Sequence, residues 1–261
     1  MTPILTRPTR DAVVLTLGAL LVLASGCGPG GHARESSRRQ AEDQAANAPY
    51  QSDVEEGLGA AVAILVDTSG SMAKEAPGDS RPKFVVAQQA LEAMLDATDA
   101  FIAKRPDFPI KIGLYSFSSS VHTVRPIQPY DRAALRAALT ELPRPGGGTG
   151  IGDAMREARP DLYRAGVFRK YLLVVTDGEN THGRDPEDVA REIWGKSEGA
   201  VQVYFVAFDT SPGKFAFLKD VGGDVIAAGT GAELRTALDG IYAGKILAEA
   251  VDAGEREPAR K

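Results

Sequence analysis

The stretch Asp67-Thr68-Ser69-Gly70-Ser71 follows a run of apolar residues, 60–66, and carries three oxygen-bearing side chains spaced two residues apart. In an extended loop, side chains at this spacing project to one side, whereas on a helix Ser69 would point away from the other two. A carboxylate and two hydroxyls, with no Cys or His among them, suit a hard cation such as Mg2+ or Mn2+ and not a structural zinc ion. The stretch therefore predicts a metal-binding loop at the carboxyl end of a strand.

Two further stretches offer oxygen donors where the backbone can turn sharply. They are Gly147-Gly148-Thr149-Gly150 and Thr176-Asp177-Gly178-Glu179, and the second comes at the end of an apolar run. A lone Asp-x-Ser-x-Ser pattern would be weak, because short polar motifs recur by chance in loops. Each residue taken singly also fits ordinary turn, loop or helix-capping chemistry. Because the three stretches occur together, we expect one shared metal site.

In this order and context, the three stretches resemble the metal-ion-dependent adhesion site of von Willebrand factor type A domains. The resemblance implies that Ser69, Ser71 and, in one of the family's conformations, Thr149 offer hydroxyls to the metal ion. It implies that Asp67 and Asp177 bind the ion directly or through water. It also implies a recognition mechanism, in which an Asp or Glu of a protein partner completes the coordination shell of Mg2+ or Mn2+.

Residues 58–247 alternate between short apolar runs and helical patterns, and we expect them to form one domain. Strands are predicted at 60–66, 110–117, 171–176 and 201–208, with an edge strand at 121–127. Helices are predicted at 83–104, 132–142, 151–164, 186–196, 215–220 and 232–247. This alternation predicts a doubly wound, mostly parallel α/β sheet flanked by helices, the Rossmann-like architecture that the family resemblance also implies. Such sheets bind ligands beyond the carboxyl ends of strands where strand order reverses, and Asp67 and Asp177 both lie at predicted strand ends.

The composition argues against one class of partner. The chain has 261 residues, of which 43% are apolar, and this proportion fits an ordinary globular core. Its formal net charge is −5, whereas nucleic-acid binding usually requires a basic face. We therefore expect no nucleic-acid partner.

Residues 1–26 have the features of a secretory signal peptide. Arg7 and Arg10 precede an apolar run at 12–24 that is too short and too early for a comfortable membrane span. We therefore expect the protein to be exported.

Cys27, the only cysteine, directly follows Leu23-Ala24-Ser25-Gly26. This junction resembles a bacterial lipobox, although Ala24 stands where Leu is usual. The resemblance implies cleavage before Cys27 and acylation of its thiol. The alternative is ordinary signal cleavage that leaves a free thiol, since a lone cysteine forms no internal disulfide.

The segments on either side of the predicted domain have few large apolar side chains. Residues 28–57 cannot bury enough surface to offset the entropy of ordering, so 27–57 are expected to be the lipidated cysteine and a flexible tether. The charged residues 248–261 are expected to be a disordered tail. Because Gly28, not Asp, follows Cys27, a Gram-negative host would pass the lipoprotein to the outer membrane, facing the periplasm or the cell surface.

Enzymatic functions fit the sequence less well. No Lys follows the glycine-rich stretch, as it would in a phosphate-binding loop, and no G-x-S-x-G nucleophile motif surrounds the serines. A metal-dependent phosphoryl-transfer hydrolase using Asp67 stays open, although that family has a second Asp where this chain has Ser69. An envelope scaffold with a purely structural metal ion also stays open. We expect a membrane-anchored binding module, not an enzyme.

Overall fold

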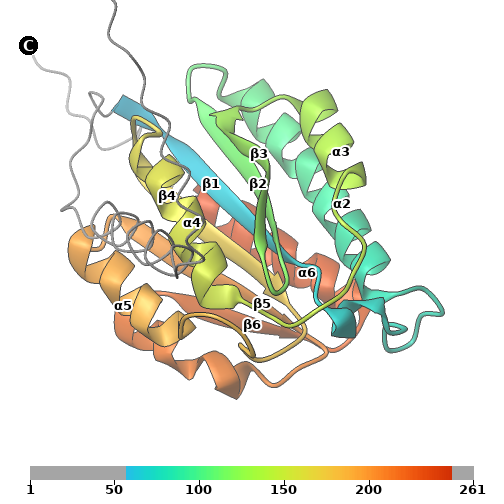
Figure 1. The fold of residues 1–261 in the computed structure, drawn as a ribbon. Helices are drawn as coiled ribbons and strands as arrows, with labels where there is room; N and C mark the ends of the chain where they lie inside the picture. The colour runs from blue at the N-terminus through green and yellow to red at the C-terminus, as the bar shows by residue number, and fades with distance from the viewer. Residues whose placement is uncertain (1–56, 249–261) are drawn as a thin grey trace, which may run out of the picture. The chain divides into compact units, whose positions relative to one another are not determined.

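The computed structural model describes residues 57–248, which form a six-stranded sheet with helices on both faces (Figure 1). The strand order is β3-β2-β1-β4-β5-β6, and every neighbouring pair is parallel except β2 and β3. The strands are β1 (Gly57–Asp67), β2 (Ile110–Phe117), β3 (Val121–Pro129), β4 (Val167–Thr176), β5 (Val201–Phe208) and β6 (Asp224–Ala228). The predicted doubly wound, mostly parallel sheet is confirmed. The predicted signal peptide, Cys27 and nearly all of the predicted tether and tail lie outside the described residues.

Helices fill most of the connections between strands. They are α2 (Lys83–Lys104), α3 (Arg132–Thr140), α4 (Ile151–Tyr163), α5 (Pro186–Lys196) and α6 (Gly231–Ile241), with the 3-10 helices η1 (Gly70–Ala73) and η2 (Pro212–Val221) and the π-helix η3 (Tyr242–Leu247). Within residues 57–248, no helix is long and apolar enough to cross a membrane.

Two elements near the carboxyl end differ from the sequence prediction. Strand β6 was not predicted, because it has only five residues and most of them are only partly buried, which leaves a weak apolar signal. The helix expected at 232–247 is α-helical only as far as Ile241 and continues as the π-helix η3.

Strand β1 lies at the centre of the sheet and is buried on both faces. Its even-numbered residues 60–66 belong to a core that includes side chains of α2, α3 and α6. Its odd-numbered residues 61–65 belong to a second core, which includes side chains of α4 and α5. Because successive strand residues face opposite sides, a strand between two helical layers is apolar at every position.

Local sequence sets the start of two helices. The side chain of Asp131 accepts a hydrogen bond from Ala134 N (3.0 Å) at the start of α3. The side chain of Asp185 accepts one from Glu187 N (2.8 Å), and Pro186 is the first residue of α5. Aspartate caps and a proline at the first helical position are both favoured at helix N-termini. The cap at Asp185 also ends the loop that begins with Asp177.

The point where strand order reverses lies at β1, which pairs with β2 on one side and with β4 on the other. The register matches Val66 with Val175, so β1 and β4 end level with each other. Asp67 is the last residue of β1, and Asp177 comes directly after β4. The sheet therefore brings these two carboxylates to one edge.

Candidate metal centre

Two of the three polar stretches meet in direct contact at the carboxyl ends of β1 and β4. Ser71 Oγ donates a hydrogen bond to Asp177 Oδ1 (2.6 Å) across a sequence separation of 106 residues. Ser69 Oγ lies 3.0 Å from Ser71 Oγ. Asp67 accepts a hydrogen bond from Ser69 N (2.7 Å). Four of the five predicted ligands thus form one connected group of oxygen atoms.

Asp67 is fully buried, and both of its carboxylate oxygens accept hydrogen bonds. Oδ1 accepts from the backbone of Ser69, and Oδ2 accepts from the hydroxyl of Thr176 (2.6 Å). Burial raises the pKa of Asp67 to about 6, although the hydrogen bonds from Thr176 and Ser69 act to lower it. A divalent cation beside this carboxylate would favour its charged form, which burial alone disfavours.

The backbone of the Asp67–Ser71 stretch differs from the extended loop that the sequence analysis assumed. Ser69 is extended, with φ −69° and ψ 169°, but it is the N-cap of η1, and Ser71 lies within that 3-10 turn. The two serine hydroxyls still lie 3.0 Å apart. The 3-10 turn begins only after Ser69. Ser69 itself is therefore not helical, and its side chain is not turned away from that of Ser71.

Thr149 reaches the same region from the loop before α4. A side-chain carbon on Gly178 would lie 4.0 Å from both Thr149 Oγ1 and Ser71 Oγ, so both hydroxyls lie near Gly178, the residue after Asp177. Thr149 does not cap α4. Asn180 Oδ1 accepts the hydrogen bond from Ile151 N (2.7 Å) at that helix start. Asn180 therefore has a structural role at the start of α4.

Backbone hydrogen bonds join the loop that carries Thr149 to the loop that carries the serines. Gly70 N donates to Gly147 O (3.0 Å), and Gly146 N donates to Thr68 O (2.8 Å). Gly147 has φ +77°, and a side-chain carbon there would lie 2.8 Å from Ser119 Oγ. A positive φ together with this close approach requires glycine. The two loops are thus held as one unit.

Sequence reasoning missed two charged residues at this centre. Lys83 Nζ lies 3.0 Å from Asp177 Oδ2 and 2.6 Å from Asp209 Oδ2, and the Lys83 side chain is only 7% exposed. Burial acts to lower the pKa of Lys83, but the hydrogen bonds to Asp209 and Asp177 outweigh it and raise the pKa. Asp209 directly follows β5. Its position after a strand could have identified it as a candidate site residue, as the same position did for Asp177. Lys83 reads in the sequence as an ordinary first residue of a helix.

The donor set fits a hard divalent cation. It has two carboxylates, of Asp67 and Asp177, and three hydroxyls, of Ser69, Ser71 and Thr149. Among the described residues, no three His, Cys, Asp or Glu side chains cluster as a metal site, so a cation here would depend on hydroxyl ligands as well as carboxylates. Oxygen donors of this kind suit Mg2+ or Mn2+.

Comparisons with known proteins agree with this architecture. Residues 62–179 match the family model of the von Willebrand factor type A domain, a stretch that begins in β1 and ends two residues after Asp177. The described domain has the von Willebrand factor type A fold. No curated protein matches the sequence of this chain.

Solved structures with a similar fold are distant in sequence. The PilB minor pilin from Streptococcus sanguinis aligns with a TM-score of 0.60 and 15% identity over 75% of this chain and 63% of its own. A von Willebrand factor type A protein from Catenulispora acidiphila aligns with a TM-score of 0.54 and 22% identity over 72% of this chain and 42% of its own. The pilus adhesin SpaC from Lactobacillus rhamnosus GG aligns with a TM-score of 0.56 and 13% identity over 74% of this chain and 31% of its own. The chain thus covers less than two thirds of each, and at these identities the likeness shows the fold alone.

Proposed function

We propose that this protein is a lipid-anchored, extracytoplasmic von Willebrand factor type A module that binds Mg2+ or Mn2+ and, through the metal ion, an Asp or Glu of a protein partner. The observation that carries the proposal is the hydrogen bond of 2.6 Å between Ser71 and Asp177, which joins two of the predicted ligand loops. Asp67 and Ser69 extend the same group of oxygen atoms. Hard oxygen donors gathered in this way favour a hard cation.

The partial exposure of the centre supports binding of a partner. Asp67, Ser69 and Asp177 are buried, whereas Ser71 is partly exposed. A cation among them is therefore approached from the side of Ser71. If the aspartates act through water, the ion stays electrophilic, and a carboxylate from a partner is a favoured further ligand.

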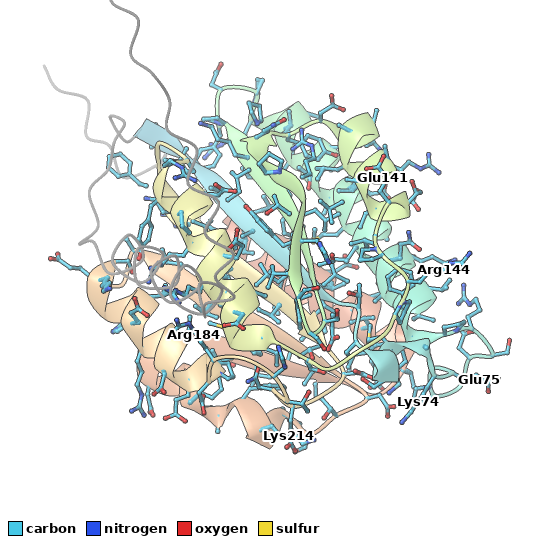
Figure 2. The ribbon with its side chains drawn as sticks, in the orientation of Figure 1. Lys74, Glu75, Glu141, Arg144, Arg184 and Lys214 are labelled. Carbon is cyan, nitrogen blue, oxygen red and sulfur yellow. The ribbon has the colours of Figure 1, made fainter. Side chains whose placement is uncertain are left out.

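Loops around the centre carry exposed charges that can select the partner. Figure 2 shows Lys74 and Glu75 projecting from the loop that follows η1, and Lys214 projecting at the same end of the domain. A cavity of about 650 Å³ lies between this loop and the start of α6 and is lined in part by Asp79, Arg81 and Arg235. Charged rims give specificity more than affinity. The cavity offers room for a second side chain of the partner.

Two further features support the proposal. The sequence around Cys27 supports the lipid anchor. Two of the structures that share the fold are, by name, a minor pilin and a pilus adhesin, and this supports a role in protein–protein interaction.

The environment of Asp67 favours binding over phosphoryl transfer. A nucleophilic carboxylate must present an oxygen atom to its substrate. Asp67 is fully buried, and hydrogen bonds engage both of its oxygens. A hydrolase that uses Asp67 is therefore the weaker candidate.

Capture of partners with and without a chelator tests the proposed function. The exported chain would be immobilised and exposed to an envelope extract of its own host in Mg2+ or in EDTA. We expect Mg2+-dependent capture by the wild type and none by Asp67→Ala. Arg136→Ala, which removes only a surface ion pair with Glu92, is the matched control and should capture as the wild type does. Capture that is indifferent to both EDTA and Asp67→Ala would favour a scaffold with a structural metal ion.

A further inference from the structure

The two carboxylate oxygens of Asp177 face different groups. Oδ1 accepts the hydrogen bond from Ser71 (2.6 Å), on the side of the proposed ligands. Oδ2 faces the ammonium of Lys83 (3.0 Å). The charge of Asp177 is therefore shared between a proposed metal ion and a cation that belongs to the chain.

The ammonium of Lys83 is held in place. Its side chain is 7% exposed, and Nζ has a second carboxylate partner in Asp209 Oδ2 at 2.6 Å. The backbone of Lys83 is also fixed, because its N–H donates to Lys74 O (2.9 Å). A buried ammonium between two carboxylates has no comparable place to move to, since leaving them would strand charges away from water.

Charges at the centre balance when a divalent ion is present. Asp67, Asp177 and Asp209 supply three negative charges when ionised, and Lys83 with a divalent ion supplies three positive ones. The Lys83 ammonium can therefore stay beside Asp177 when a metal ion binds. It repels the ion, and it draws negative charge away from Asp177, one of the two proposed carboxylate ligands. At short range and partial burial, such repulsion is large compared with thermal energy.

We infer that Lys83 is a fixed internal cation that weakens divalent-metal binding at this centre, and that Asp209 limits this effect by sharing the ammonium with Asp177. The inference rests on the proposed metal-binding function and deepens it. A metal ion held against this repulsion gains more from one further negative ligand. Lys83 thereby increases the dependence of the loaded centre on the acidic residue of a partner.

Titration with Mn2+ alone tests the inference, with free Mn2+ measured by electron paramagnetic resonance. We expect Lys83→Met to bind Mn2+ at least about tenfold more tightly than the wild type, because a like charge is removed. Lys83→Arg keeps the charge and should stay within about threefold of the wild type. Asp209→Asn should bind more weakly by about threefold or more, because the ammonium then pairs with Asp177 alone.

The direction of the change in Mn2+ affinity distinguishes this electrostatic role of Lys83 from a structural one. If Lys83 only positioned Asp177, Lys83→Met would bind Mn2+ more weakly, and that result would overturn the inference. Circular dichroism of each variant checks folding. Should Lys83→Met not fold, Asp209→Asn decides, because the Asp209 side chain is 38% exposed and asparagine keeps its size and shape. Unchanged or tighter binding by Asp209→Asn would then reject the inference.

Failure of the inference and failure of the proposed function are distinguishable. Absence of Mn2+ binding by the wild type would remove the metal-binding function and this inference together. Binding by the wild type with equal affinity in Lys83→Met would reject the inference alone.

Discussion

At the residue scale, Asp67 shows why a cation would stabilise the candidate metal centre. It is fully buried at the end of the central strand, and two hydrogen bonds do not offset its burial, which raises its pKa to about 6. Ser69 and Ser71 lie beside it with their hydroxyls 3.0 Å apart. Native structure is needed to assemble these oxygens, so a metal ion that binds them must stabilise the fold.

Mg2+ should therefore raise the free energy of unfolding of the wild type. At a concentration about 100 times the Kd, mass action gives a gain of about 2.7 kcal/mol. Asp67→Ala should lose this gain, since it removes a proposed ligand. Urea unfolding at matched ionic strength, with and without Mg2+, measures both values. Equal stabilisation of wild type and Asp67→Ala would contradict the assignment of the metal centre.

Thr149→Ala should weaken partner binding and leave the fold intact. The change removes the hydroxyl and the γ-methyl group of a buried side chain that lies outside the two hydrophobic cores, so the free energy of unfolding without metal should fall by about 1 kcal/mol or less. Calorimetric titration with the captured partner measures the affinity. The matched variant of the partner replaces its metal-binding Asp or Glu with Asn or Gln. This variant should lose most of its affinity, because a neutral amide oxygen is a poorer ligand for a hard cation. Undiminished binding in both cases would place the interface elsewhere.

At the scale of elements, the centre depends on two loops that dock at the ends of parallel strands. Strands β1 and β4 pair in register up to Val66 and Val175, which brings their following loops together. The glycine-rich loop before α4 then joins the loop after β1 through two backbone hydrogen bonds. Parallel strands that end together place their loops at one edge, and that edge is where ligands bind in such sheets.

Gly147→Ala should disturb this docking. Gly147 has φ +77°, and a side-chain carbon would lie 2.8 Å from Ser119 Oγ, so we expect a cost of about 1–3 kcal/mol. Mg2+ affinity should fall with it, because Gly147 O also accepts the hydrogen bond from Gly70 N. Gly146→Ala is the matched control, since nothing lies within 4 Å of a side-chain carbon there. Chemical unfolding and Mg2+ titration of both variants measure the difference, and equal behaviour would contradict the docking argument.

At the scale of the whole molecule, the proposal combines a binding domain with an anchor. The domain carries the candidate metal centre at one edge of its sheet. The anchor depends on Cys27, which lies outside the described residues. If both are present, the partner is captured at a membrane surface.

Acylation of Cys27 should make the full-length protein partition into detergent and resist a high-salt wash. Acyl chains are held by hydrophobic burial and not by charge, so salt does not release them. Cys27→Ala should instead be recovered in the aqueous phase. Phase separation followed by mass spectrometry of the amino terminus measures the anchor. Recovery of the wild type wholly as soluble, unacylated protein would reject the lipobox.

The sequence alone was sufficient for the alternation of elements, because a strand buried on both faces reads as a continuous apolar run, as 60–66 does. It also indicated which residues to examine at the strand ends, Asp67 and Asp177. It missed β6, which is short and only partly buried. Periodicity is a local signal, and it is strongest where burial is complete.

Only the tertiary structure brought Ser71 against Asp177 and placed Lys83 between Asp177 and Asp209. These contacts join residues that are far apart in the chain, and they depend on strand order and register. A lysine at the start of a helix looks the same in sequence whether its ammonium meets water or two carboxylates. If the centre binds a metal ion as proposed, the charge of Lys83 acts on that ion because the fold buries the ammonium beside Asp177.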